Sequence, residues 1–374
     1  MFYQVLISDF LNDNRVEKTT ESLNRAGVDM KVLCLGREGV DYPKHEYEVK
    51  RVYLLSQNWS KFFLIQIFKF LELIFKMCLY LKKNNARVLH CNDLGGLIVG
   101  FTFKLFLERS VKLIYDSHEF QTEVHGLSKN QKKMRKFLES LLIKKVAETI
   151  TVSESIALAY QKDYSIAKPV VIYNVPYLAE IKKNNKLREV FHISETDILF
   201  IYQGLISKAR GVKEIAEGFM SSKNQAAHVV FMGNGPYVNE IKSLSEECHN
   251  IHYHPPVKKE ELLNYSSSAD FGIHLIPNTC LNHDYCMPNK LFEYLSSSLP
   301  LVVSDVHDMS NFVIKNEIGV VIKSERFDID TLLLSIDKDK INHYKNNCKK
   351  LSKIYNWEQE EVKLLSIYNR LGVL

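Results

Sequence analysis

The stretch YCMPNKLFEYLSSSLPLVVSD, residues 285–305, predicts a short helix followed by a buried strand. Pro288 stands where a helix can begin, because proline in the first helical turn loses no hydrogen bond. Pro300 ends the helix, and residues 301–303 then read as a strand that is buried on both faces. The apolar residues between the two prolines recur at helical spacing: Leu291, Phe292, Tyr294 and Leu295.

The polar residues of this helix lie within its first two turns: Asn289, Lys290 and Glu293. Lys290 can meet a phosphate near the helix N-terminus, where the backbone dipole favours negative charge. Glu293 can accept two hydrogen bonds from a ribose diol. The pattern indicates a nucleotide-diphosphate site, although a surface helix whose polar residues meet only water has the same spacing.

Composition places the chain among ordinary globular proteins. Its 374 residues suffice for two domains with substantial cores, and 46% of them are hydrophobic and 25% charged. The formal net charge of +5 is too small to indicate nucleic acid, so we expect no nucleic-acid partner.

The seven cysteines are odd in number, scattered and without a CxxC pair, which argues against a disulfide framework. Cys280, His283 and Cys286 are spaced three apart, but no fourth ligand is evident, and we expect no metal. The start MFYQVLISDF has no basic region before its apolar residues and does not resemble a secretory signal. We therefore expect a cytoplasmic location.

The first half of the chain alternates strands with helices, which predicts a doubly wound parallel sheet. Its expected strands are 3–8, 31–35, 87–91, 111–115, 149–152 and 170–173. The first turn, FLNDNRV, lacks GxGxxG, so a phosphate there is not expected. Polar residues follow two inner strands, at 90–93 and 116–119, and such positions line the ligand crevice of a parallel sheet.

The second half repeats this alternation after a lysine- and asparagine-rich run, IKKNNK. Its expected strands are 198–202, 228–232, 251–253, 271–275, 301–303 and 320–322. Two turns carry glycine where a strand gives way to a helix, at Gly204 and at Gly233, and glycine lets a backbone approach a ligand closely. Arg210, after the first of these turns, is suited to clamping a diphosphate.

Two helices raise the question of a membrane. Lys69, Glu72 and Lys76 interrupt the apolar segment 59–83 at helical spacing, which makes a membrane-spanning helix costly. A helix that covers the sheet with its polar stripe toward water fits the pattern, and contact of its apolar face with a bilayer is the second interpretation.

The segment 128–145 is a basic helix, which is either a solvated surface helix or a surface attracted to anionic lipid headgroups. Nucleic acid fits less well, because no aromatic residues interleave with the charges. Its basic residues are Lys129, Lys132, Lys133, Arg135, Lys136, Lys144 and Lys145.

Six short motifs are spread along nearly the whole chain: DNRV (13–16), DSHE (116–119), YQG (202–204), RG (210–211), GNGP (233–236) and PNKLFEY (288–294). Together they resemble the family 4 glycosyltransferases of the GT-B fold, most of all the bacterial branch that builds capsule, O-antigen and exopolysaccharide. The resemblance implies an α/β protein with two Rossmann-like doubly wound domains that face each other across a cleft.

The resemblance also implies that the two domains bind different substrates. Residues 1–175 would form the acceptor-binding domain, rejoined by the C-terminal helix 357–374, and residues 190–356 the nucleotide-sugar-binding domain, after a linker at 176–189. The implied reaction is retaining transfer from a nucleotide-diphosphate sugar, most commonly a UDP-sugar, without a cofactor or metal. The acceptor would be a glycan or a lipid-linked glycan, and the enzyme would be cytoplasmic or peripheral on the inner membrane.

Site residues are carried over by position. The resemblance implies donor binding by Gly204, Lys208, Arg210, Gly233, Asn234, Met287, Pro288, Asn289, Lys290, Leu291 and Glu293. It implies acceptor binding by Asp13, Arg15, Asn92, Asp93 and His118, and catalytic roles for His118, Glu119 and Asp284.

One departure from the family pattern concerns the donor sugar. The wider family has a glutamate eight positions before the one at Glu293, and this chain has Tyr285 there, with Asp284 beside it. In the family this glutamate helps to hold the donor sugar, and here Asp284 or the backbone at Cys286 and Met287 would hold it. Two other functions stay open: a non-hydrolysing nucleotide-sugar epimerase, and a non-catalytic scaffold in a polysaccharide-assembly complex. The sequence names neither the sugar nor the acceptor.

Overall fold

The structure is a computed structural model that describes residues 1–11, 13–60, 62–323 and 327–374. The chain divides into two compact units. The first unit comprises Met1–Tyr173 and Glu361–Leu374, and the second comprises Asn174–Glu360.

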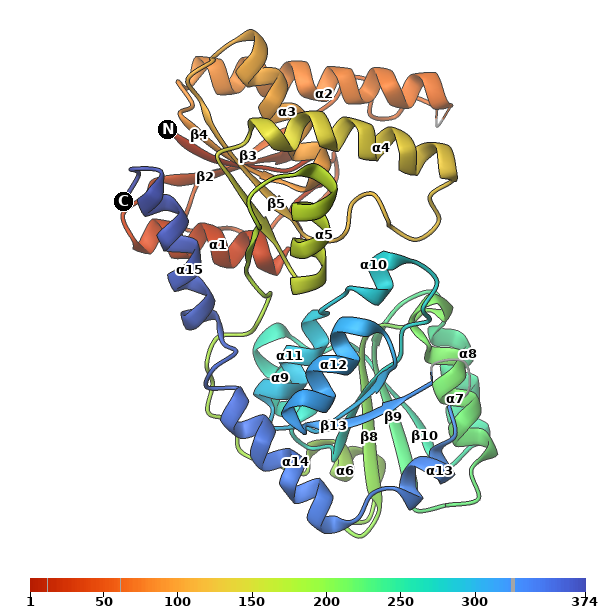
Figure 1. The fold of residues 1–374 in the computed structure, drawn as a ribbon. Helices are drawn as coiled ribbons and strands as arrows, with labels where there is room; N and C mark the ends of the chain where they lie inside the picture. Colours follow the sequence, from red (N-terminus) through yellow and green to blue (C-terminus); the bar gives the residue numbers. More distant parts are fainter. Residues whose placement is uncertain (12, 61, 324–326) are drawn as a thin grey trace. The chain divides into compact units, whose positions relative to one another are not determined.

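The first unit is built on a seven-stranded parallel sheet with the strand order β3-β2-β1-β4-β5-β6-β7 (Figure 1). The order changes direction between β1 and β4, and the carboxyl ends of strands at such a point are where open parallel sheets bind ligands. The strands are β1 (Phe2–Val5), β2 (Met30–Leu35), β3 (Val49–Val52), β4 (Val88–Asn92), β5 (Lys112–Ser117), β6 (Glu148–Thr151) and β7 (Val170–Val171).

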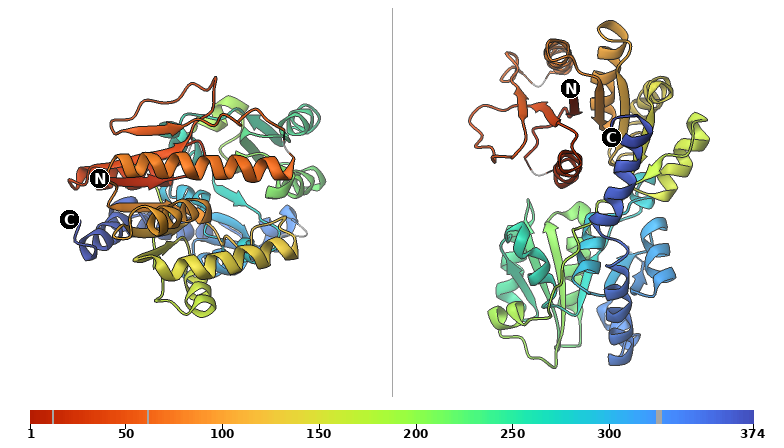
Figure 2. Two further views of the ribbon diagram at one scale, coloured as in Figure 1. Left: turned by 90° about the horizontal axis from the view of Figure 1, so that it is seen from above. Right: turned by 90° about the vertical axis from the view of Figure 1, so that its left-hand side faces the viewer.

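Helices cover this sheet, and α2, α3 and α4 lie side by side in one layer (Figures 1 and 2). Three successive right-handed crossovers, from β3 to β6, put them on the same face. The C-terminal helix α15 (Trp357–Arg370) also belongs largely to this unit, where Leu364, Ile367 and Tyr368 are fully buried. The other helices are α1 (Asn14–Arg25), α2 (Phe63–Lys83), α3 (Asp93–Phe106), α4 (Lys129–Leu142), the 3₁₀ turn η1 (Ile143–Lys145) and α5 (Glu154–Tyr164).

The second unit has a six-stranded parallel sheet with the order β10-β9-β8-β11-β12-β13, which changes direction between β8 and β11. Its strands are β8 (Ile198–Leu205), β9 (Ala227–Asn234), β10 (Ile251–His254), β11 (Phe271–His274), β12 (Leu301–Ser304) and β13 (Gly319–Ile322). Its helices are α6 (Lys186–Phe191), η2 (Lys208–Arg210), α7 (Val212–Ser221), α8 (Val238–Glu247), α9 (Lys259–Ser266), α10 (Leu281–Asp284), α11 (Asn289–Ser296), α12 (His307–Asn316), α13 (Ile329–Leu334) and α14 (Lys338–Leu351).

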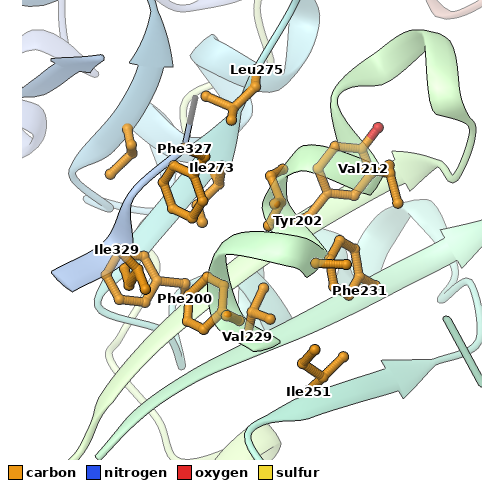
Figure 3. Packing of buried hydrophobic residues seen from close by; sticks show 14 of the residues in the cluster. Phe200, Tyr202, Val212, Val229, Phe231, Ile251, Ile273, Leu275, Phe327 and Ile329 are labelled. Atoms are coloured by element: carbon orange, nitrogen blue, oxygen red, sulfur yellow. The ribbon is translucent and has the colours of Figure 1, made fainter. Parts of the chain in front are cut away.

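Aromatic and β-branched side chains from the central strands form the core of this second unit (Figure 3). Phe200 of β8 stacks on Phe271 of β11 with ring centroids 5.3 Å apart. Tyr202 and Phe231 pack in the next layer, with centroids 5.8 Å apart. Burying these rings fixes the positions of the strand ends that carry the candidate site.

The prediction of two Rossmann-like α/β sheets is confirmed, and every strand expected from the sequence overlaps an observed one. The edge strand β3 was missed, because it is short and its central residues, Lys50 and Arg51, are charged. Helix α1 begins at Asn14, because the Asp13 side chain caps it by accepting hydrogen bonds from Arg15 N and Val16 N at 3.2 and 3.1 Å.

Candidate functional site

Two glycines stand opposite each other at the carboxyl end of the second sheet. Gly204 of β8 pairs with Gly233 of β9 in the parallel register. A Cβ on Gly233 would lie 1.9 Å from the Gly204 carbonyl oxygen, and a Cβ on Gly204 would lie 2.8 Å from Cε of Lys290. Both glycines have positive φ, +155° and +106°. They therefore let two strand ends and a lysine side chain approach one another closely.

We expect Gly233→Ala to lower the free energy of unfolding by about 2 to 4 kcal/mol, since the added methyl group meets rigid backbone at an unfavourable φ. Gly126→Ala is the matched control: Gly126 has φ +85°, but nothing lies within 4 Å of an added Cβ. That variant should lose only about 1 kcal/mol. Chemical denaturation measures both, and equal losses would rule out the contact with Gly204 as the cause.

The side chain of Lys290 fills the space in front of Gly204. Pro288 is the N-cap of α11, so Lys290 lies in its first turn. The Nζ atom is buried, has no hydrogen-bond partner among the described residues, and lies 4.0 Å from the ring centroid of Tyr202. Burial, followed by the charge of Arg210, lowers the pKa of Lys290 to about 7. A buried ammonium group without an acceptor, at a helix N-terminus, is arranged to receive an anion.

His274 was missed in the sequence, although it lies near these cations. It is the last residue of β11 and is fully buried. Neither of its ring nitrogens has a hydrogen-bond partner within the described part of the chain. Burial, with the charges of Lys290 and Arg210, holds the pKa of His274 well below its usual range. Its only signal in the sequence was a histidine at the carboxyl end of a buried strand.

Glu293 is held in place by the end of β8. Its Oε2 accepts a hydrogen bond from Gln203 Nε2 at 2.6 Å, and Gln203 Oε1 accepts one from Ser266 Oγ at 2.5 Å. The hydroxyl oxygen of Tyr294, the next residue, accepts from Gln203 N at 3.1 Å. The carboxylate of Glu293 is therefore held about one helical turn after Lys290, on the same side of α11.

The other predicted donor residues fall into two groups. The side chains of Leu291, fully buried, and Met287, 8% exposed, belong largely to the core. The second group is wholly or partly exposed: Lys208, Arg210, Asn234, Asn289 and the half-buried Pro288. The structure brings Gly204, Gly233, Lys290 and Glu293 together, and the donor roles of the whole set stay a prediction.

Asp284, the last residue of α10, connects this short helix to the start of α12. Its Oδ1 accepts hydrogen bonds from Asn278 Nδ2 and from His307 N, both at 3.0 Å. The ring of Tyr285 packs edge-on against His307, with centroids 6.3 Å apart. These contacts give Asp284 a structural role, and its catalytic role stays a prediction.

The spacing of Cys280, His283 and Cys286 raised the question of a metal. Nδ1 of His283 lies 2.8 Å from the Pro277 carbonyl oxygen. Burial raises the pKa of the Cys286 thiol to about 12, whereas a metal-bound cysteine is a thiolate. In the described ranges no group of three or more His, Cys, Asp or Glu side chains is arranged to hold a metal ion.

In the first unit, His118 follows the carboxyl end of β5 and is embedded among acids. Its backbone N donates to Asp93 Oδ1 at 3.0 Å, and its Nδ1 lies 3.9 Å from Asp93 Oδ2. Its Nε2 lies 3.7 Å from Asp116 Oδ2. Burial alone would lower the pKa of His118, but Asp93 and Asp116 outweigh it and raise the pKa to about 9. His118 is therefore a cation at neutral pH.

A directed chain of hydrogen bonds shows which nitrogen of His118 carries a proton. Thr19 Oγ1 donates to backbone carbonyl oxygens of α1, so it accepts from Gln4 Nε2 at 2.8 Å. Gln4 Oε1 then accepts from Asn92 Nδ2 at 2.8 Å, which leaves Asn92 Oδ1 facing His118 Nε2 at 3.1 Å. Because Asn92 Oδ1 can only accept, Nε2 of His118 must be protonated.

Arg15 is buried in a bidentate pair with Asp116, and its acceptor-binding role stays a prediction. Its Nε and Nη2 donate to the two carboxylate oxygens at 2.9 and 2.8 Å, and its Nη1 donates to the Ile172 carbonyl oxygen at 2.8 Å. The two side chains are only 3% and 1% exposed. His90 completes the group, 3.2 Å from Asp116 and 2.9 Å from the Tyr368 hydroxyl of α15. This geometry favours a positioning role beneath His118.

The other residues predicted for the first unit surround His118 or support it. Asn92 and Asp93 contact it directly, and Asp93 has a left-handed backbone with φ +56°. Asp13 caps α1. The carbonyl oxygen of Glu119 accepts from Ser117 Oγ at 2.7 Å. Their acceptor-binding and catalytic roles stay predictions.

Two family models match the chain. Residues 14–175 match the model described as Glycosyltransferase Family 4, and residues 215–356 match the model described as Glucosyltransferase 3-like, C-terminal domain. No curated protein sequence matches the chain.

Solved structures of low sequence identity share the fold over the whole chain. The sucrose-phosphate synthase of Thermosynechococcus elongatus has a TM-score of 0.78 at 15% identity, with 100% of this chain and 99% of that chain covered. The HepE protein of Anabaena, in complex with UDP-glucose, has a TM-score of 0.73 at 13% identity, with 100% of both chains covered. WaaG, a glycosyltransferase involved in lipopolysaccharide biosynthesis, has a TM-score of 0.62 at 14% identity, with 98% and 99% covered. Residues 14–175 therefore belong to glycosyltransferase family 4, and the chain as a whole is a glycosyltransferase with the GT-B fold.

Proposed function

We propose that this protein transfers a sugar from a UDP-sugar to a glycan or lipid-linked glycan acceptor, with retention of the anomeric configuration, in the synthesis of a bacterial surface polysaccharide. The assignment of a UDP-sugar as donor rests on one observation. The ammonium group of Lys290 at the start of α11 is buried and has no hydrogen-bond partner among the described residues. Such a group is costly in the ligand-free protein and becomes favourable when an anion binds.

In this proposal the diphosphate binds at the first turn of α11. Lys290 and His274 meet its oxygens, and Arg210 neutralises the charge from the exposed side. Negative charge develops on the diphosphate as the bond to the sugar breaks, so fixed cations and the helix dipole lower the barrier without a metal ion. The negative charge of the bound diphosphate would also raise the pKa of Lys290, so that the lysine carries its full charge in the complex.

The first donor to test is UDP-glucose. HepE was solved with UDP-glucose, and the model that matches residues 215–356 is described as glucosyltransferase 3-like. The acceptor is assigned to the first unit, where His118 supplies a cation fixed by Asp93, Asn92 and Asp116. Transfer to a lipid-linked glycan on the cytoplasmic face of the inner membrane agrees with the seven free cysteines.

A thermal-shift series tests the donor assignment. UDP and UDP-glucose should raise the melting temperature, because a ligand that binds only the folded chain stabilises it by mass action. GDP- and ADP-glucose are the comparison ligands. No shift with any nucleotide sugar at millimolar concentration would contradict the proposal.

Glu293→Gln should weaken UDP binding about 10-fold and leave the affinity for pyrophosphate unchanged, since only the ribose hydrogen bonds are lost. Calorimetric titration with each ligand measures the difference. Glu240→Gln, on the exposed face of α8, is the control. An equal loss for UDP and pyrophosphate would contradict the ribose assignment.

One observation keeps a rival hypothesis in view. Asp284, the carboxylate nearest the position of the missing glutamate, already accepts hydrogen bonds from Asn278 and from the start of α12. A non-catalytic scaffold would bind a partner and leave the donor intact, whereas a transferase slowly hydrolyses its donor in the absence of an acceptor. An epimerised sugar after incubation with donor alone would favour the epimerase instead.

A further inference from the structure

The outward face of helix α2 is apolar. Five apolar side chains that are half or more exposed follow one another along α2 at intervals of three or four residues, which places them on one side of the helix. They are Leu64 (63% exposed), Phe68 (51%), Leu71 (57%), Phe75 (64%) and Leu79 (50%). Exposed apolar faces of this extent on a folded protein mark a surface that contacts another body.

The three charged residues of the polar stripe of α2 are only partly exposed, and they bind backbone groups of the segment that precedes the helix. Glu72 accepts hydrogen bonds from Leu55 N at 2.7 Å and from Ser56 N at 3.2 Å. Lys69 Nζ donates to the carbonyl oxygens of Gln57 and Trp59, both at 2.9 Å, and Lys76 Nζ donates to that of Tyr53 at 2.8 Å. The segment between β3 and α2 thus satisfies all three charges, and the side left to solvent is the apolar one.

Helix α4 combines exposed apolar residues with positive charge. Met134, Phe137 and Leu141 are 63%, 67% and 51% exposed and recur at helical spacing. The single acid of α4, Glu139, is fully buried and accepts hydrogen bonds from Tyr115, Tyr160 and Tyr164. The exposed charges on α4 and η1 are therefore all positive: Lys129, Lys133, Lys136, Lys144 and Lys145.

These two faces belong to one layer of helices. α3 lies between α2 and α4, and its end adds the exposed side chains of Leu105 and Phe106 (Figures 1 and 2). Both α2 and α4 begin at the carboxyl edge of the sheet, because each follows the end of a parallel strand, β3 and β5. His118 lies at this same edge. We call the outward faces of α2 and α4, with the end of α3, the helical-layer surface.

We propose that the helical-layer surface docks on an anionic lipid bilayer. Its apolar stripe suits the boundary between headgroups and acyl chains, and the five exposed lysines suit anionic headgroups. Trp59, which stacks on Phe68 with ring centroids 5.6 Å apart, and the exposed Phe62 and Phe63 supply aromatic groups at the end nearest the sheet's carboxyl edge. No described helix is long and apolar enough to cross a membrane.

Docking in this way would bring the carboxyl edge of the first sheet, and His118, next to the lipid surface. A lipid-linked acceptor would then reach the edge without leaving the bilayer. The docking proposal does not depend on the proposed transfer reaction, because vesicle binding is measured without donor or acceptor.

The first experiment removes the apolar part. The chain is sedimented with vesicles of phosphatidylcholine alone and of phosphatidylcholine with 30% phosphatidylglycerol. The variant Leu71→Gln/Phe75→Gln should lower binding to the anionic vesicles at least 10-fold. The control, Ile314→Gln/Val362→Gln, changes residues that are each 63% exposed outside this surface and should bind as the parent does. Equal binding by both double variants, or no vesicle binding by the parent, would overturn the proposal.

The second experiment reverses charge. Lys133→Glu/Lys144→Glu/Lys145→Glu should lower binding to anionic vesicles about 100-fold or more, and the parent's binding should fall as salt is raised. The control reverses three lysines of the exposed basic end of the second unit, Lys349, Lys350 and Lys353. Equal binding of the parent to neutral and anionic vesicles would overturn the lipid assignment. So would a parent dimer in solution that the Leu71/Phe75 variant abolishes, because the surface would then bind a second copy.

Discussion

Replacing Lys290 by methionine should lower kcat/KM for the donor about 100- to 1,000-fold while making the ligand-free protein more stable. The ammonium group is buried without an acceptor, so removing its charge relieves a cost that the folded chain carries only in the absence of donor. We expect the free energy of unfolding to rise by about 1 to 3 kcal/mol at neutral pH. Loss of activity with a gain in stability is the signature of a binding group rather than a structural one.

The pH dependence of this gain sharpens the test. The pKa of Lys290 is lowered from 10.5 in the unfolded chain to about 7 in the folded one. Its destabilising effect is therefore complete below pH 7 and fades as the pH rises toward the unfolded value. The advantage of Lys290→Met should be largest at acid pH and vanish at alkaline pH. A lower stability of the variant at every pH would contradict the assignment.

Lys242→Met provides a matched control for Lys290→Met. Lys242 also lies over a tyrosine ring, with its Nζ 5.0 Å from the Tyr253 centroid, but it is exposed on α8. Its replacement should change neither kcat/KM nor the free energy of unfolding beyond about 0.5 kcal/mol. Denaturant titration and steady-state kinetics on both variants give the comparison.

His118→Gln should lower kcat about 100- to 1,000-fold and leave UDP affinity unchanged, because the proposed role of this cation is in the transfer step and not in nucleotide binding. Since the neighbouring carboxylates raise the pKa of His118 to about 9, the parent enzyme should stay active through neutral pH and lose activity as the pH rises past that value. If His118 acted as a neutral base instead, activity would rise through the same range.

Asp93→Asn removes the negative charge beside His118 and keeps the size and shape of the side chain. Asparagine tolerates the left-handed backbone at this position, φ +56°, and keeps the acceptor for His118 N. Removing the charge should lower the pKa of His118, so the alkaline loss of activity should begin about one pH unit earlier. Asp29→Asn, whose side chain is 74% exposed, is the control and should leave the pH profile of kcat unchanged.

Local patterns predicted much of this protein. Alternating buried strands and helices led to both parallel sheets, and residues 285–305 led to α11 with Lys290 and Glu293. Strand prediction works here because central strands such as β4, β9, β11 and β12 are covered on both faces and are largely apolar. The exception is β3, where pairing along one edge stabilises a strand with charged residues at its centre.

What the sequence determined by itself is therefore the order of the elements, the fold class and the residues at strand ends and helix starts, since these follow from neighbours in the chain. Three properties were decided only by tertiary structure. His274 and Lys290 are left without partners because strands and helices distant in sequence enclose them. The protonation of His118 Nε2 is set by a chain of side chains from α1, β1 and β4. The apolar face of α2 is turned to solvent because a preceding segment binds its charges, and helical periodicity defines two faces without stating which one lies outside.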